Sequence, residues 1–244
     1  MKDQKKRRRV SKDFVRSNAS QSRGIVEGLE REYGAAMRVL VGCEESGTVR
    51  DAFRSRGHDA WSCDLLPSRS PGQHLRCDIF EALQQRWDLI ILHPDCTALS
   101  LSGNRTYGAG KPKNHDRIAS LDWTERLWLR ATSVSPLVAL EQPMSVLAER
   151  LGSPDCIIHP WEFGHPEQKQ TWLWLRGLPP LKPTKVVWAE MMRLPKRERE
   201  RVQYMAPSPE RKRDRAKTYT GVADAMAVQW GEVARCYLGE IDSG

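Results

Sequence analysis

Short apolar runs alternate along this chain with segments whose apolar residues recur at helical spacing, and the pattern begins near Met37. The apolar runs predict strands at residues 39–41, 59–63, 74–77, 87–92, 136–140 and 172–175. Helical spacing predicts helices at residues 48–56, 123–133 and 223–237, with Gly57 as a stop signal for the first. Strands that alternate with helices favour an α/β fold with a Rossmann-like, doubly wound and mostly parallel sheet.

One predicted strand leads directly into a turn that contains a cysteine. The apolar run that ends at Leu92 is followed by His-Pro-Asp-Cys-Thr, so Cys96 stands just beyond a buried strand. In open α/β sheets, ligands bind beyond the carboxyl ends of the strands. Cys96 is therefore a candidate nucleophile. The alternative is a free structural cysteine in an ordinary loop.

The first predicted strand ends in a glycine-containing turn, Gly-Cys-Glu-Glu-Ser-Gly, that opens the first helix. Such a turn is where α/β folds hold a nucleotide-like cofactor. Asp64 follows Gly47 by 17 residues at the end of the second strand, and Asp78 follows 14 residues later at the end of the third. An acid at the first position can bind the hydroxyls of a ribose. Each feature also has a simpler interpretation, namely steric need for the glycine and helix capping for each acid.

The composition limits the class of protein. A length of 244 residues allows one α/β domain with a sizeable core and appendages. No apolar run reaches membrane-spanning length and the first residues are charged, which predicts a protein of the cytoplasm without a membrane segment. The six cysteines form no Cys-x-x-Cys pair, and no histidine cluster has metal-ligand spacing. We therefore expect neither a disulfide framework nor a bound metal.

The net charge of +8 is concentrated in two segments. Residues 1–36 contribute +5 and residues 193–217 contribute +6, which leaves −3 for the remaining chain. Two basic segments on a mildly acidic body predict attraction to a polyanion such as nucleic acid, although both could simply be solvated. The first segment is too polar to fold alone, so we expect a disordered extension before a domain that begins at Met37. It is either a native basic arm or a product of start-site choice.

Several motifs, in order, resemble those of the cytosine-5 DNA methyltransferases, particularly the short phage-encoded type. The family's Phe-x-Gly-x-Gly loop corresponds to residues 43–47, of which only Gly47 is kept, and its Pro-Cys-Gln motif to Asp95-Cys-Thr97. Its Glu-Asn-Val motif corresponds to Glu141-Gln-Pro143, 45 residues beyond Cys96. A looser similarity joins its Gln-x-Arg-x-Arg motif to residues 168–171, and residues 219–225 are similar to the start of its closing helix.

This resemblance implies a class I methyltransferase that uses S-adenosylmethionine, and it assigns roles to particular residues. The implied cofactor contacts are Cys43, Glu44, Ser46, Gly47, Asp64, Leu65, Asp78, Ile79 and Pro94. The implied catalytic residues are Cys96, Glu141, Lys169 and Thr171. Cys96 would add to carbon 6 of cytosine, which activates carbon 5 for methylation. Glu141, protonated or sharing a proton, would stabilise the charge on the ring. The alternative for Glu141 is an ion pair with a nearby arginine.

A base inside a duplex cannot reach such a site, so the implied DNA substrate must be flipped out or single-stranded. The Gly-rich, basic loop at residues 103–115 could close over the nucleotide, or could be an ordinary mobile loop. The predicted nucleic-acid contacts are Arg105, Lys111, Lys113, Arg211, Lys212 and Arg213.

The chain departs from the family in three places. Glu45 stands where a glycine is usual, and Thr97 where a glutamine is usual. Only a short Pro-rich and basic segment, residues 179–217, separates the catalytic core at 37–178 from the closing helix and tail at 218–244, in place of a target-recognition domain. We therefore expect short or relaxed sequence specificity. The alternatives to a DNA methyltransferase are transfer to a free or modified pyrimidine nucleotide, and a non-catalytic DNA-binding relative.

Overall fold

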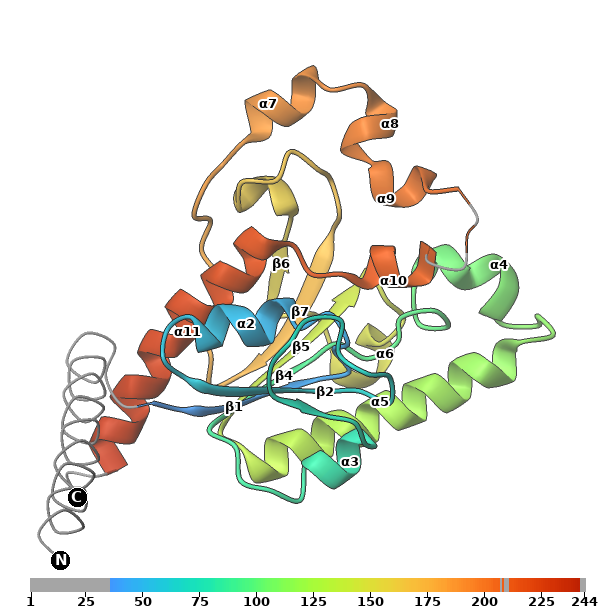
Figure 1. Cartoon of the computed structure of the whole chain (residues 1–244). Helices are drawn as coiled ribbons and strands as arrows, with labels where there is room; N and C mark the ends of the chain where they lie inside the picture. Colours follow the sequence, from blue (N-terminus) through green and yellow to red (C-terminus); the bar gives the residue numbers. More distant parts are fainter. Residues whose placement is uncertain (1–35, 207, 209–210, 242–244) are drawn as a thin grey trace, which may run out of the picture. The chain divides into compact units, whose positions relative to one another are not determined.

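The computed structural model describes residues 36–206, 208 and 211–241. Within these residues, seven strands form one sheet in the order β3-β2-β1-β4-β5-β7-β6 (Figure 1). The strands are β1 (Arg38–Gly42), β2 (Asp59–Cys63), β3 (His74–Leu75), β4 (Leu89–Leu92), β5 (Leu137–Pro143), β6 (Cys156–Ile158) and β7 (Thr171–Arg176). Neighbours from β3 to β5 are parallel, and β7 is antiparallel to β5 and β6. The predicted α/β fold with a mostly parallel sheet is confirmed, and it is compatible with a Rossmann-like fold.

Helices cover both faces of the sheet because the side chains of each central strand point alternately to opposite faces. Val39 and Val41 of β1 pack in one cluster with residues of α2 (Thr48–Arg54) and α11 (Thr220–Ile241). Leu40 lies in a second cluster with residues of α3 (Ile79–Ala82) and α5 (Asn114–Val134). The buried strands therefore carry continuous apolar sequence, which is what made them recognisable.

Most predicted elements are present, but with different boundaries. The first helix ends at Arg54 rather than 56, β3 is shorter than residues 74–77, and α11 extends beyond 223–237 at both ends. Helix α5 begins at Asn114, nine residues before the predicted start, because its first turns are polar and give no apolar stripe. The short strand β6 was not predicted, since three residues are too few to define a pattern.

The segment between β7 and α11 contains four short helices among the described residues. Three of them, α7 (Trp188–Arg193), α8 (Lys196–Arg199) and α9 (Arg201–Tyr204), lie at the top of Figure 1, and α10 (Arg211–Ala216) lies below them. The remaining short elements are η1 (Leu101–Gly103), α4 (Asn104–Tyr107), α6 (Ala148–Leu151) and η2 (Pro160–Glu162).

The chain divides into two compact units, Met1–Ala36 and Met37–Gly244. The predicted disorder of residues 1–36 concerns positions that lie, except for Ala36, outside the described part of the chain. Among the helices that are described, none is both long and apolar enough to cross a membrane.

Candidate active site at the carboxyl ends of the strands

The carboxyl ends of β1, β2, β4 and β5 form one edge of the sheet, where the chain order reverses between β1 and β4. This reversal is where open α/β sheets bind ligands. Leu92 of β4 is paired with Leu140 of β5, so the next residues, His93 and Glu141, extend from neighbouring strands at the same level. Their side chains meet, with 3.7 Å between His93 Nδ1 and Glu141 Oε2.

The turn that carries Cys96 is held from two sides. The Asp95 carboxylate accepts hydrogen bonds from the Thr97 amide, at 3.0 Å, and from the Thr97 hydroxyl, at 2.6 Å. From β5, the fully buried Gln142 donates through Nε2 to the Pro94 carbonyl oxygen at 2.6 Å. Gln142, the residue after Glu141, thus connects β5 directly to the turn of Cys96. Thr97 stabilises that turn through its hydrogen bonds to Asp95.

The thiol of Cys96 is protonated in its resting state. Burial raises its pKa, and the negative charges of Glu141 and Asp95 raise it further. The Lys169 ammonium and the Arg215 guanidinium act in the opposite direction without cancelling the increase. A reaction that needs the thiolate therefore requires loss of this proton first.

The carboxyl of Glu141 is charged. Burial works to raise its pKa, but the His93 ring and the Lys169 ammonium outweigh that effect and hold the pKa below its usual value. A permanently protonated Glu141, one of the two predicted forms, disagrees with this electrostatic environment. The other form, a carboxylate that shares a proton with a neighbour, is consistent with the position of His93.

Lys169 and Thr171 line a small pocket together with Glu141, which brings together three of the four predicted catalytic residues. Lys169 Nζ donates to the Arg215 carbonyl oxygen of α10 at 3.1 Å and lies 5.8 Å from the centre of the Tyr219 ring. The remaining lining residues come from β6, from η2, and from α11 and the two residues before it, namely Ile158, Pro160, Thr218, Tyr219, Val222 and Met226. The fourth predicted residue, Cys96, does not line the pocket, but its thiol is close enough for the charges of Glu141 and Lys169 to act on it.

The predicted cofactor turn is stabilised by its own acidic residue. The buried Glu44 carboxylate accepts hydrogen bonds from the Val49 amide of α2, at 2.8 Å, and from the Ser46 hydroxyl, at 2.9 Å. The side chain of Glu44 therefore caps the helix, which leaves a cofactor contact to the main chain of the turn. Cys43 has a φ of 59°, a conformation that is uncommon for a residue with a side chain and turns the chain sharply after β1.

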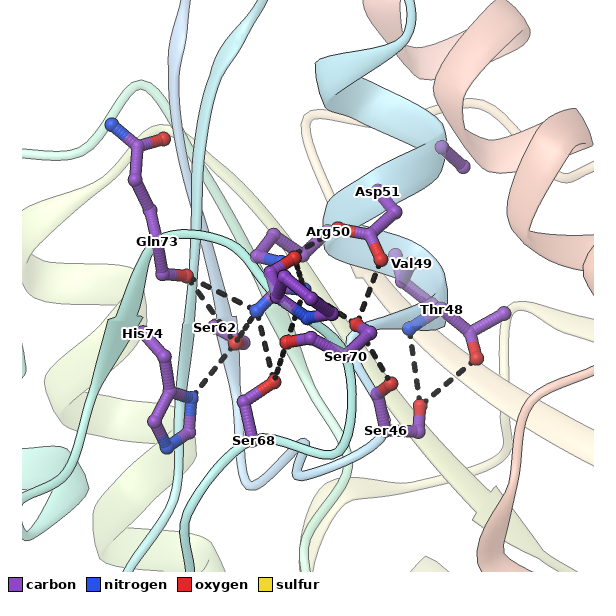
Figure 2. A network of polar contacts seen from close by, with 12 residues as sticks. Ser46, Thr48, Val49, Arg50, Asp51, Ser62, Ser68, Ser70, Gln73 and His74 are labelled. Atoms are coloured by element: carbon purple, nitrogen blue, oxygen red, sulfur yellow. Dashed lines mark hydrogen bonds and ion pairs between the residues drawn. The ribbon is translucent and has the colours of Figure 1, made fainter.

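A buried arginine joins this turn to the loop after β2, as Figure 2 shows. Arg50 is fully buried, and its guanidinium donates to the hydroxyls of Ser62, Ser68 and Ser70. It also donates to the Asp51 carboxylate at 2.8 Å and to three main-chain carbonyl oxygens, those of Ser70, Pro71 and Gln73.

Gly47 and Gly72 lie against this guanidinium. A Cβ atom at Gly47 would lie 2.5 Å from Arg50 Nη2, and one at Gly72 would lie 2.8 Å from the same atom. Both glycines also have positive φ, 73° and 148°. The glycine that the resemblance assigns to cofactor contact is thus required by internal packing as well.

The acids predicted to hold the cofactor gather around the end of β1. Asp64, Asp78 and Asp95 all raise the pKa of the Cys43 thiol, which burial raises most, to about 12. The Asp64 carboxylate accepts a hydrogen bond from the Leu66 amide at 2.9 Å, and Asp78 caps α3 through the Phe80 amide at 2.8 Å. Asp78 therefore caps a helix, as in its simpler interpretation, and this cap does not exclude a cofactor contact. Ile79 is buried in the core, where it contacts the position of Gly42.

The predicted nucleic-acid contacts lie on two separate elements. Arg105 on α4 and Lys111 and Lys113 before α5 are exposed. Arg211, Lys212 and Arg213 begin α10, whose residue Arg215 contacts Lys169 through its carbonyl oxygen.

The loop predicted at residues 103–115 contains α4 and is anchored at its start. The buried Arg117 donates to the Ala98 carbonyl at 2.7 Å and to the Asn104 side chain at 2.7 Å. The first residues of this range are therefore helical and hydrogen-bonded to the Arg117 guanidinium, and both interpretations of the loop stay predictions.

Sequence reasoning missed the residues that hold the site together, namely His93, Gln142, Arg50 and Arg117. His93 and Gln142 stand inside motifs that were recognised, so their position next to Cys96 and Glu141 was an available signal. Nothing in the pattern marked Arg50 or Arg117, because a buried arginine at helical spacing is indistinguishable from a solvated one in a single sequence.

Comparison with known proteins gave no further assignment. No model of a protein family matches the chain, and none of the curated proteins matches it. In the part of the chain that the structure describes, no group of three or more His, Cys, Asp or Glu side chains could hold a metal ion.

Proposed function

We propose that this protein is a DNA (cytosine-5-)-methyltransferase that uses S-adenosylmethionine and forms a covalent adduct through Cys96. The observation that supports this most is that a carboxylate and an ammonium, which line one pocket, both act electrostatically on the Cys96 thiol, although the three groups come from separate segments. A structural cysteine in an ordinary loop needs none of these neighbours. The resemblance of the motifs gives the arrangement its chemical interpretation.

Each of the three groups has a task in that reaction. The Cys96 thiolate forms a bond to carbon 6 of cytosine, and the electron pair of the ring double bond moves so that carbon 5 becomes nucleophilic. Glu141 supports this by holding a proton at ring nitrogen 3, where negative charge develops. Lys169 favours the thiolate through its positive charge. S-adenosylmethionine, when bound, supplies the methyl group from its sulfonium.

The residues around the end of β1 would suit a cationic cofactor with a ribose. The charges that raise the pKa of the Cys43 thiol come from the carboxylates of Asp64, Asp78 and Asp95. Next to Asp64, the Leu65 side chain is 67% exposed, an apolar surface on which a flat base can pack. Asp64 would hold the ribose hydroxyls, Asp78 the adenine edge, and the main chain of residues 43–47 the remaining part of the cofactor.

The proposed substrate is a cytosine that is flipped out of a duplex or present in a single strand. Arg105, Lys111 and Lys113 follow the nucleophile in sequence and are exposed, as phosphate contacts must be. The short helices between β7 and α11 leave little room to recognise base edges, which favours relaxed sequence specificity. The same shortness favours a free or modified pyrimidine nucleotide as the second candidate substrate.

A substrate with fluorine at carbon 5 tests the covalent step. DNA that contains 5-fluorocytosine should form a stable complex with the protein and S-adenosylmethionine, since no proton can leave carbon 5 after transfer. Peptide mass analysis should find the adduct on Cys96, and Cys96→Ser should give none. An enzyme that methylates ordinary DNA but forms no adduct would instead transfer the methyl group to an exocyclic nitrogen.

A further inference from the structure

The two ring nitrogens of His93 are buried, and the ring faces a charged group. The side chain is 9% exposed, and among the described residues neither Nδ1 nor Nε2 has a partner within hydrogen-bond distance. Glu141 Oε2 lies 3.7 Å from Nδ1, slightly too far for a hydrogen bond by distance but close enough for the ring to lower the pKa of the carboxyl. Buried polar atoms are almost always paired, so an unpaired ring at a candidate active site calls for an explanation.

The position of His93 follows from the strands. Its amide donates to the Gly42 carbonyl oxygen at 2.9 Å, which continues the pairing of β4 with β1 by one residue. The backbone of His93 is therefore fixed, and its ring stands one level above the Leu92–Leu140 pair, next to Glu141. Only a small movement of either side chain brings Nδ1 within hydrogen-bond distance of the carboxylate.

The charged and titratable groups around this pair come from several elements. Glu141 belongs to β5, Lys169 precedes β7, and Arg215 belongs to α10. Asp95 and Cys96 lie in the turn after β4, on the chain segment of His93 itself. The group in contact with the His93 ring is Glu141, which belongs to the proposed catalytic machinery and is ionised.

We propose that His93 holds the proton that Glu141 passes to ring nitrogen 3 of the substrate, so that the two side chains act as one proton-sharing unit. This inference rests on the proposed function. It resolves a difficulty of that function, because Glu141 is ionised and has no proton of its own to give. His93 acts through Glu141 and is a positioning residue, not a residue that contacts the base.

The proton can be followed through one cycle. As the Cys96 sulfur bonds to carbon 6, the N–H bond at Nδ1 of the doubly protonated, cationic His93 ring breaks and an O–H bond forms on the Glu141 carboxyl, which leaves a neutral imidazole. The carboxyl proton moves to nitrogen 3, and the electron pair displaced from the ring double bond is stabilised. When the sulfur–carbon bond breaks at the end of the reaction, the same proton returns through Glu141 to His93. No proton is gained or lost by the pair.

The variant His93→Asn tests this, because an asparagine side-chain nitrogen can take the place of Nδ1 as a hydrogen-bond donor but cannot deliver a proton. The single-turnover rate of methyl transfer is measured from pH 6 to pH 9 for the parent and the variant, and the ratio of the two is taken at each pH. Thiol ionisation affects both proteins and largely cancels in the ratio. We expect the variant to be slower by roughly 10²-fold at a pH where the pair of the parent holds its proton.

The deficit should narrow only at pH values where the pair of the parent already holds its proton, because a further fall in pH then protonates Glu141 of the variant from solvent without changing the parent. A variant as fast as the parent would overturn the proposal. His58→Asn is the matched control, since His58 is also buried but precedes β2 at the opposite edge of the sheet. It should leave the pH dependence of the rate unchanged.

A second measurement separates this inference from the proposed function. The ring nitrogen signals of His93 in the full chain, identified by their loss in His93→Asn, are recorded by NMR over the same pH range in the parent and in Glu141→Gln. Loss of the carboxylate should alter the pH dependence of these signals and leave those of His58 unchanged. Unaltered His93 signals would refute proton sharing. A parent without methyl transfer would refute the proposed function, and the NMR result alone would then decide whether the pair shares a proton.

Discussion

Replacing Arg50 should destabilise the fold and loosen the proposed cofactor site. The variant Arg50→Met keeps the length and the apolar stem of the side chain but removes the guanidinium. The guanidinium is fully buried, and its three nitrogens donate to acceptors in Asp51, Ser62 and the loop of residues 68–73. This is the network drawn in Figure 2.

The size of the effect depends on which acceptors regain water. Removing one partner of a buried ion pair typically costs about 3–5 kcal/mol of the free energy of unfolding. The carboxylate of Asp51 is 44% exposed and can rehydrate, whereas Ser62 is fully buried and keeps only its contacts with His74 and Gln73. We therefore expect a loss near the lower limit, about 3 kcal/mol.

Urea unfolding of the full chain, followed by circular dichroism, measures this loss as a shift in the midpoint at constant slope. Arg54→Met is the matched control, an exposed arginine on the same helix, and should change the stability by no more than about 0.5 kcal/mol. Titration calorimetry should also show weaker S-adenosylmethionine binding to Arg50→Met, since the anchored loop follows directly on Asp64. If the two variants had the same midpoint, the network in Figure 2 would not stabilise the fold.

Three further predictions concern the site itself. Alkylation of Cys96 by iodoacetamide should increase with pH above neutrality because the pKa of its thiol is raised. Lys169→Met should shift this pH profile to higher pH, and Glu141→Gln should shift it to lower pH. Shifts of both variants in the same direction would contradict the electrostatic account. Asp64→Ala should weaken S-adenosylmethionine binding by about 1–3 kcal/mol, and unchanged affinity in calorimetry would remove it from the cofactor site. Charge reversal of the three basic residues that begin α10, Arg211, Lys212 and Arg213, should weaken DNA binding and reduce its salt dependence. If the variant's affinity depended on salt concentration as the parent's does, these side chains would be solvated and would not contact DNA.

The central strands could be predicted from the sequence because they are buried on both faces. Continuous apolar runs such as the one that forms β4 are typical of strands in the middle of a parallel sheet. The antiparallel direction of β7 could not be predicted, since an apolar run carries no information on strand direction. The start of α5 was missed because its only buried residue in the first turns is an arginine, Arg117.

The residues with a proposed chemical role could be predicted from motifs, whereas the contacts that hold and charge them could not. The order of motifs singled out Cys96 and Glu141, and the structure brings them close enough for one to act electrostatically on the other. The hydrogen bond from Gln142 to the turn of Cys96 depends on the register between β4 and β5, which no local pattern encodes. The charge state of Glu141 depends on neighbours from different elements in the same way.

The most direct test of the central claim is a nucleoside analysis of DNA after reaction. A cytosine-containing DNA is incubated with the purified full chain and isotope-labelled S-adenosylmethionine, digested to nucleosides and analysed by mass spectrometry, with Cys96→Ser in parallel. The account predicts labelled 5-methyl-2′-deoxycytidine with the parent protein and none with the variant. No labelled nucleoside, a label on the exocyclic nitrogen, or equal labelling by Cys96→Ser would contradict it.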